Sequence, residues 1–419
     1  MQINPVLLMG EAIPSLNLNF LTGSLDSRIT FTRASSGTYF DSTGTLKTAS
    51  TDVARFDYNP ATLAPGGLLI EQASTNLALY SEQFDNVAWA LTATTVTANA
   101  TTAPDGNVTA DKLKEDNTTS IHSVTNTVSF SVTSGTTYTG SIFLKAAERG
   151  YAFVVISGAT TFTTAGISVN LTTGAVSTAT GTPVNAFTQT LPNGWFRVGF
   201  SLAATGTATD AKFDVRCSTD GVWANRSYTG TTGSGIYVWG AQFEATAYQT
   251  SYIATTSASV TRAADVSLIN TLTPWYNAAQ GTFVITATGV NNVNGGTRRF
   301  LEIGVSGSTN NRMIIGYAST NQTRFLVVTG GATQADITVS GTAGSRIKMA
   351  AAYNANDFQQ ATNGVLGTQD TSGTVPTISS IAIGSDFGST ANAILNGWIE
   401  SIKYYPVRLP DATLQALTS

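Results

Sequence analysis

The sequence contains very few of the side chains on which most catalytic and metal sites depend. Its 419 residues include one cysteine and one histidine. Because Cys217 has no second cysteine to pair with, an intrachain disulfide is excluded, as are zinc and iron–sulfur sites built from several cysteines. A nucleophile activated by histidine would have to use His122, and the residues around it are typical of a strand. We therefore expect His122 to be a partly exposed strand or loop residue.

Charged residues are also scarce. They make up 11% of the chain, against about 25% in an average soluble protein. The net charge of −4 gives no overall attraction to nucleic acid, and no apolar run has the length of a membrane span. Met1–Gly10 lacks the basic start of a signal peptide. We expect a protein made in the cytosol that binds no nucleic acid and does not insert into a membrane.

What the chain does contain is typical of β structure. Apolar residues reach 42%, which is enough for a core, and Thr and Gly are abundant. Short segments that alternate apolar and polar residues, such as Ile29–Thr32, predict half-buried strands. Gly, Asn or Pro separates most of them, and Asn363-Gly364 predicts a hairpin turn. The sequence therefore predicts an all-β fold.

Changes in this pattern divide the chain into four parts. Residues 1–80 hold short strands in irregular surroundings, residues 81–256 and 276–419 each hold enough strands for a β-sandwich, and residues 257–275 form a connector. We expect an irregular N-terminal region followed by two β-sandwich (jelly-roll) domains. Since residues 1–80 are too short for a sandwich of their own, we expect them to serve in attachment or assembly.

Three parts of the chain resemble known families. A set of short N-terminal segments resembles a signature of tailed-bacteriophage and prophage virion proteins: Arg33–Asp41, Arg55–Tyr58, Gly67–Glu71 and Thr75–Leu77. The segment from Trp89 to Glu244 is similar to jelly-roll carbohydrate-binding modules, and residues 281–417 resemble a concanavalin A-like, laminin-G-type sandwich. The resemblance implies a virion surface protein of the fibre, spike or decoration type with a role in binding host glycans. It assigns no particular binding residues.

The pattern of carboxylates argues against catalysis. Glycoside hydrolysis needs two carboxylates about 5–10 Å apart, and concanavalin A-like glycosidases place them on one strand as Glu-x-Asp-x-Glu or Glu-x-Asp-x-x-Glu. Neither spacing occurs in this sequence. Glu302 and Glu400 lie on expected strands, but their alternation with apolar neighbours predicts solvent-facing side chains. We therefore expect a protein that is not an enzyme.

One loop carries the residue types of a lectin site. Sugar sites combine an aromatic ring with polar side chains that bond hydroxyl groups. Residues 219–228 contain five such candidates: Asp220, Trp223, Asn225, Arg226 and Tyr228. We predict that this loop contacts a glycan. The alternative is that Trp223 folds back and covers the end of the sandwich.

A second feature is a local excess of positive charge. Between residues 298 and 348 there are six basic residues against two acidic ones, a local charge of about +4: Arg298, Arg299, Arg312, Arg324, Arg346 and Lys348 against Glu302 and Asp336. This segment is either a solvated sheet face or a docking surface for an acidic partner, such as a capsid shell or an anionic polysaccharide.

Metal binding has little support in the sequence. Both sandwich families often carry a structural calcium ion, which oxygen ligands would hold. The best candidates are Asp386 and Asn392, which flank a Gly-rich loop. The alternative is that they are ordinary turn residues. We expect no required cofactor.

Together these observations predict a non-enzymatic structural protein on the surface of a phage virion, in a head or tail fibre, spike or decoration. We expect other virion proteins of the capsid or tail, host cell-surface polysaccharide and further copies of the chain as its partners. A free bacterial carbohydrate-binding protein and an unrecognised glycosidase are the alternatives.

Overall fold

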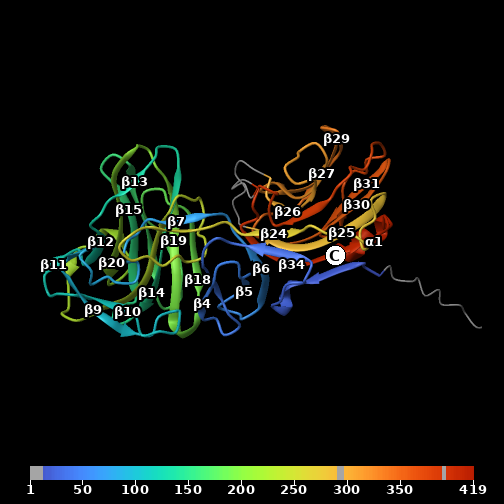
Figure 1. The fold of residues 1–419 in the computed structure, drawn as a ribbon. Coiled ribbons are helices and arrows are strands. Elements are labelled where there is room, and N and C mark those ends of the chain that lie inside the picture. The colour runs from blue at the N-terminus through green and yellow to red at the C-terminus, as the bar shows by residue number, and fades with distance from the viewer. Residues whose placement is uncertain (1–12, 290–296, 389–392) are drawn as a thin grey trace, which may run out of the picture. The chain divides into compact units, whose positions relative to one another are not determined.

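The computed structural model describes residues 13–289, 297–388 and 393–419. Within these residues the chain forms two compact units (Figure 1). The C-terminal unit comprises the described parts of Met1–Thr32, Gly66–Gln72 and Asp265–Ser419, and the central unit comprises Arg33–Pro65 and Ala73–Ala264. The chain therefore passes between the units four times, after Thr32, Pro65, Gln72 and Ala264.

The C-terminal unit is an antiparallel sandwich of two sheets. The strands that this unit contributes to one sheet have the order β32 (Val365–Leu366), β31 (Asp357–Thr362), β30 (Arg346–Asn354), β25 (Gln280–Gly289), β34 (Gly397–Tyr405) and β6 (Pro65–Ile70), and β1 (Leu16–Asn19) also pairs with β34. In the other the order is β2 (Ile29–Thr32), β24 (Val266–Ile269), β33 (Ser380–Ile383), β26 (Arg299–Gly304), β27 (Arg312–Ser319), β28 (Gln322–Thr329) and β29 (Ala332–Ser340).

Alternation along these strands places apolar side chains on two faces. Phe283 and Met349 are buried, whereas Val284 and Ala350 point to the opposite face, because successive residues of a strand alternate. On that face they pack with Leu414 of helix α1 (Asp411–Thr418). The 3₁₀ turn η1 (Phe20–Thr22) follows β1.

Parts of the N-terminal region belong to these sheets instead of forming a separate region. Leu18 of β1 pairs with Ile402, and Phe31 of β2 pairs with Ser267 of β24. The structure therefore differs from the expected division, in which residues 1–80 and the connector 257–275 stand apart. The reason is that apolar side chains of the short strands, such as Leu18, are buried only once the strands join a sheet.

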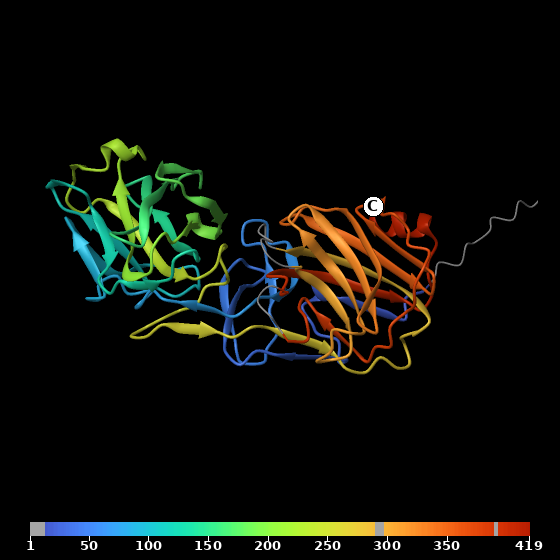
Figure 2. The same ribbon diagram turned by 90° about the horizontal axis from the view of Figure 1, so that it is seen from above.

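The central unit is a second antiparallel sandwich (Figures 1 and 2). Its six-stranded sheet has the order β18 (Val184–Thr190), β19 (Trp195–Ala203), β14 (Thr137–Ala146), β22 (Gly235–Glu244), β10 (Ala110–Glu115) and β9 (Thr94–Thr101). Its seven-stranded sheet has the order β17 (Val176–Thr180), β16 (Phe162–Asn170), β15 (Tyr151–Gly158), β20 (Ala208–Ser218), β12 (Ser123–Asn126) and β8 (Trp89–Thr92), with β13 (Phe130–Val132) also paired to β20.

Side chains from both sheets fill the core of the central unit. Ile142 and Val198 come from the six-stranded sheet, and Val154 and Val215 come from the seven-stranded sheet. Smaller elements surround the sandwich: the pairs β3 (Gly37–Phe40) with β4 (Leu46–Ala49), β7 (Ser74–Asn76) with β23 (Val260–Arg262) and β11 (Thr119–Ser120) with β21 (Tyr228–Thr229), the strand β5 (Phe56–Tyr58), and the 3₁₀ turns η2 (Pro192–Gly194) and η3 (Trp223–Asn225). The prediction of an all-β fold with β-sandwiches is confirmed.

The outer face of the six-stranded sheet is covered by the chain itself. Trp195 and Trp239 are buried there, in one cluster with Phe40 and Leu46 of the β3–β4 hairpin and with Tyr252. The Trp239 and Tyr252 rings lie 4.9 Å apart. These aromatic rings are therefore part of the packing and are not presented to solvent.

Candidate functional site

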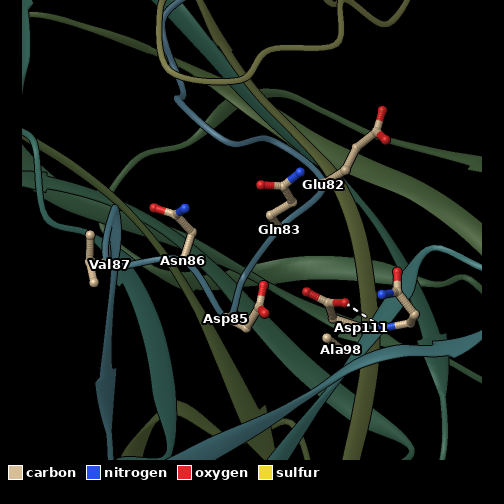
Figure 3. Close-up of a pocket in the computed structure, with 8 residues that line it drawn as sticks. Glu82, Gln83, Asp85, Asn86, Val87, Ala98 and Asp111 are labelled. Atoms are coloured by element: carbon tan, nitrogen blue, oxygen red, sulfur yellow. Dashed lines mark hydrogen bonds between the residues drawn. The ribbon is translucent and has the colours of Figure 1, made fainter.

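An open cavity of about 420 Å³ lies in the central unit, beside the end of β10 (Figure 3). Its volume falls in the range of about 300–1,000 Å³ that is typical of small-molecule sites. Eight residues line it, six of them polar: Glu82, Gln83, Asp85, Asn86, Val87, Ala98, Asn99 and Asp111. They come from the segment before β8, from β9 and from β10.

Asp111 joins two walls of this cavity. Its side chain is buried, and its two carboxylate oxygens accept hydrogen bonds from the backbone N–H groups of Phe84 (2.8 Å) and Asn99 (2.9 Å). Burial raises the pKa of Asp111, although these two N–H groups oppose the change. Because the side chain is buried and each oxygen accepts a backbone hydrogen bond, Asp111 serves chiefly to position the walls of the cavity.

Glu82 and Asp85 are the other carboxylates of the lining. The Tyr252 hydroxyl donates a hydrogen bond of 3.1 Å to Oε1 of Glu82. Burial raises the pKa of Glu82, and the negative charge of Asp105 acts in the same direction. The charge of Asp85 likewise raises the pKa of Asp111. Figure 3 shows the carboxyl groups of Asp85 and Asp111 close together in the view, whereas Glu82 extends away from them.

This lining can hydrogen-bond a polyhydroxyl ligand. Its carboxylates accept hydrogen bonds from hydroxyl groups, and the carboxamides of Gln83, Asn86 and Asn99 both donate and accept them. None of the eight lining residues is basic. The sequence analysis did not predict this cavity, because its lining comes from three segments that are separated along the chain.

The five residues of the predicted glycan loop do not converge on one open site. Asp220 accepts a 2.7 Å hydrogen bond from the Asn225 side chain, and this bond contributes most to lowering the pKa of Asp220. The Tyr228 hydroxyl instead donates a 2.5 Å hydrogen bond to Glu115. Asp220 and Asn225 therefore stabilise the loop itself, and Tyr228 fastens it to β10.

Trp223 packs against the sandwich. Its ring system and that of Phe153 of β15 form a T-shaped contact with a centroid distance of 5.3 Å. The guanidinium groups of Arg216 and Arg226 lie over the Trp223 ring, 5.0 and 4.9 Å from its centroid. This is the contact that the alternative interpretation of the sequence expects. Glycan binding by the loop stays a prediction.

The six basic residues of the predicted docking surface lie on two sheets. Arg298, Arg299, Arg312 and Arg324 belong to the β26–β28 region, and Arg346 and Lys348 belong to β30 of the other sheet. Each has a local partner: Arg299 and Arg312 pair with Glu302, Arg324 with Asp336, Arg346 with Glu400, Arg298 with the Ile394 carbonyl and Lys348 with the Ser419 carbonyl. The structure therefore does not gather them into one outward face.

The predictions that Glu302 and His122 have exposed side chains are wrong. Glu302 is buried, because Arg299 and Arg312 cover it, and its burial raises its pKa against the opposing effect of both arginines. Glu400 lies on β34 of the other sheet and pairs with Arg346. His122, which directly precedes β12, is also buried, and its Nδ1 is 2.8 Å from the Ala93 carbonyl oxygen.

The remaining candidates from the sequence are Cys217, Asp386 and Asn392. Burial raises the pKa of Cys217 to about 12, which keeps this thiol protonated and unreactive. Asp386 lies 3.5 Å from the guanidinium of Arg299, and Asn392 lies outside the described residues. Among the residues that the structure describes, no group of three or more His, Cys, Asp or Glu side chains could hold a metal ion. Over the same ranges, no helix has the length and hydropathy needed to cross a membrane.

Comparisons with known proteins identify no family. No family model matches the chain, and no curated protein matches it. Solved structures similar to it include the carbohydrate-binding module CBM40 of the Ruminococcus gnavus IT-sialidase bound to alpha2,3 sialyllactose, with 16% identity, a TM-score of 0.29, and coverage of 34% of this chain and 84% of that chain. Domain 4 of a GH43 extracellular arabinanase from Geobacillus stearothermophilus, in complex with arabinotriose, has 12% identity, a TM-score of 0.29 and coverage of 41% and 82%. TM-scores this low assign the chain to neither protein.

Proposed function

We propose that this protein binds glycans without cleaving them and is displayed on the surface of a phage particle. The observation that carries the proposal of glycan binding is the open cavity beside Asp111, whose carboxylates and carboxamides suit sugar hydroxyl groups. The particle surface is proposed from the N-terminal segments that resemble phage virion proteins, such as Arg33–Asp41. The particle would also supply the protein partners, in its head or its tail.

The proposal of binding without catalysis rests on the state of the carboxylates. A glycosidase needs a proton-donating carboxyl and a second carboxylate that both reach the scissile bond. Asp111 is held by two backbone N–H groups, and the Glu82 side chain is held by Tyr252. Asp85 remains as a carboxylate for contact with a sugar hydroxyl.

The test of glycan binding is a titration of purified protein against an array of bacterial polysaccharides, followed by Gln83→Ala. Gln83 lines the cavity, so losing its hydrogen bonds, worth about 1 kcal/mol in total, should weaken binding roughly fivefold. Gln189→Ala on β18 is the matched control, because this residue lies in the same unit but does not line the cavity. Equal binding by both variants would contradict a role for the cavity.

Two further measurements separate the alternatives. Release of reducing ends from a bound polysaccharide, above the level of a heat-inactivated control, would support the glycosidase alternative. Mass spectrometry of purified phage particles should find the protein at a fixed copy number. Its absence from particles, together with glycan binding, would support the free bacterial carbohydrate-binding protein.

A further inference from the structure

The cavity beside Asp111 is negatively charged and contains no compensating cation. Three of its eight lining residues are carboxylates and none is basic. Asp105 adds a further negative charge near Glu82. The side chain of Lys112, the next residue after Asp111, forms an ion pair of 2.8 Å with Glu148, which does not line the cavity.

Three other buried carboxylates of the described residues are paired with arginine, whereas Glu244 accepts hydrogen bonds from the neutral groups of Ser74, Gln242 and Thr250. Glu115 is bound by Arg149, Asp214 by Arg216, and Glu302 by Arg299. At the cavity, by contrast, Glu82 is bound by a tyrosine hydroxyl and Asp111 by backbone N–H groups, which are neutral donors. Partly buried carboxylates with only neutral partners interact favourably with a cation, because burial has removed part of their hydration.

We propose that the cavity selects saccharides that carry a free amine, such as glucosamine oligomers, over their N-acetylated and carboxylated counterparts. The inference rests on the proposed function and adds the charge of the ligand to it. A protonated amine offers three hydrogen-bond donors and a positive charge to Asp85, and the carboxylates of Glu82 and Asp111 add to the negative charge of the lining. N-acetylation removes that charge, and a uronic acid would bring a fourth carboxylate to the site.

The test compares three oligosaccharides of equal length by isothermal titration calorimetry on the full chain: glucosamine, N-acetylglucosamine and galacturonic acid tetramers. We expect the glucosamine tetramer to bind roughly three- to tenfold more tightly than its N-acetylated form, as partly exposed charge pairs allow. The galacturonic acid tetramer should bind most weakly. Because exposed charges are screened by salt, the preference for the amine should shrink at high ionic strength.

Two isosteric variants connect this preference to the cavity. Glu82→Gln and Asp85→Asn each remove one negative charge from the lining and should each reduce the ratio of amine to N-acetyl affinity. Asp116→Asn removes the same charge from an exposed turn of the central unit that does not line the cavity, so it should keep the ratio of the unmodified protein.

The outcomes separate this inference from the proposed function. If the glucosamine and N-acetylglucosamine tetramers bind equally and Gln83→Ala weakens both, the cavity binds sugars but does not select the amine, which overturns the inference alone. If the preference survives in Glu82→Gln and Asp85→Asn, it arises elsewhere and the inference is wrong. If no polysaccharide of the array and none of the tetramers binds, the proposed function fails together with the inference.

Discussion

In the C-terminal unit the N-terminal residues supply strands, whereas in the central unit they supply a cover. Strands β1, β2 and β6 pair with strands of the two C-terminal sheets. Strands β3 and β4 pair with each other and with no strand of the six-stranded sheet. The hairpin that they form packs through Phe40 and Leu46 on the outer face of that sheet. Strand pairing joins the first set to its unit. The hairpin is joined to its unit by side-chain packing together with single hydrogen bonds, such as that from the Leu46 N–H to the Pro104 carbonyl.

This difference indicates that the C-terminal unit, more than the central unit, needs its N-terminal strands in order to fold. Removing β1 and β2 would take away strands and leave backbone N–H and C=O groups of β34 and β24 unpaired. Removing the contacts of the hairpin would leave both sheets of the central unit complete, because neither contains a strand from residues 33–65. It would instead expose the aromatic rings of Trp195 and Trp239.

The largest expected effect is that of a chain that begins at Arg33 and so lacks β1 and β2. Five buried apolar side chains are lost with them: Leu16, Leu18, Phe20, Ile29 and Phe31. At about 1.5–3 kcal/mol each, they are comparable to the ~5–15 kcal/mol that stabilises a whole domain. We expect the C-terminal unit to unfold and the central unit to keep its melting transition in differential scanning calorimetry. A chain that retains both transitions would show that these strands are dispensable.

A smaller effect is expected from Phe40→Ala, which breaks the cover of the central unit. Phe40 is buried against the cluster that contains Trp195 and Trp239. Loss of a buried phenylalanine costs about 3–5 kcal/mol, so the melting temperature of the central unit should fall while it still folds. Thr48→Ala, at an exposed position of β4, is the control and should change stability by less than about 0.5 kcal/mol. Complete unfolding of the central unit by Phe40→Ala would contradict the comparison.

The elements of the fold follow closely from local patterns in the sequence. Alternation in Ile29–Thr32 predicts β2, and Asn363-Gly364 predicts the turn between β31 and β32, where both residues have positive φ angles of 47° and 79°. What no local pattern contains is the pairing of Leu18 with Ile402. Residues so far apart in sequence come together only through the whole fold. The sequence therefore did not predict which segments belong to which unit.

The candidate site shows the same limit. The 82–87 segment, Asn99 and Asp111 meet through the turn before β8 and the β9–β10 pairing, and no local pattern in the sequence joins these three segments. The predicted loop did bring suitable residue types together in sequence. However, alternation and spacing do not say which partner a side chain finds, as Tyr228 with Glu115 and Glu302 with Arg299 both show.

The smallest expected effect concerns Tyr228→Phe, which tests whether the central unit is also stabilised by polar side-chain contacts away from the hairpin. Burial favours the protonated form of Glu115, but hydrogen bonds from Arg149, Tyr228 and the Thr231 N–H outweigh it and hold the pKa of Glu115 below its ordinary value of 4.5. A carboxyl group with a lowered pKa in the folded state stabilises that state above pH 4.5, and this stabilisation is lost as the pH falls through the lowered value. Removing the Tyr228 hydroxyl should cost about 1.5–3 kcal/mol at neutral pH, as for other hydrogen bonds to charged groups.

The difference in melting temperature between the unmodified protein and Tyr228→Phe should therefore be largest at neutral pH and should narrow in acid, where Glu115 takes up its proton in both. Tyr237→Phe on β22 is the matched control and should follow the unmodified protein at every pH. A difference in melting temperature that stays constant from neutral pH into acid would mean that Tyr228 contributes by packing of its ring and not by its bond to Glu115.

Because Tyr228 does not line the cavity, the variant should bind oligosaccharides with unchanged affinity. Lost binding with an unchanged melting temperature would indicate that the 219–228 loop, and not the cavity, contacts the glycan.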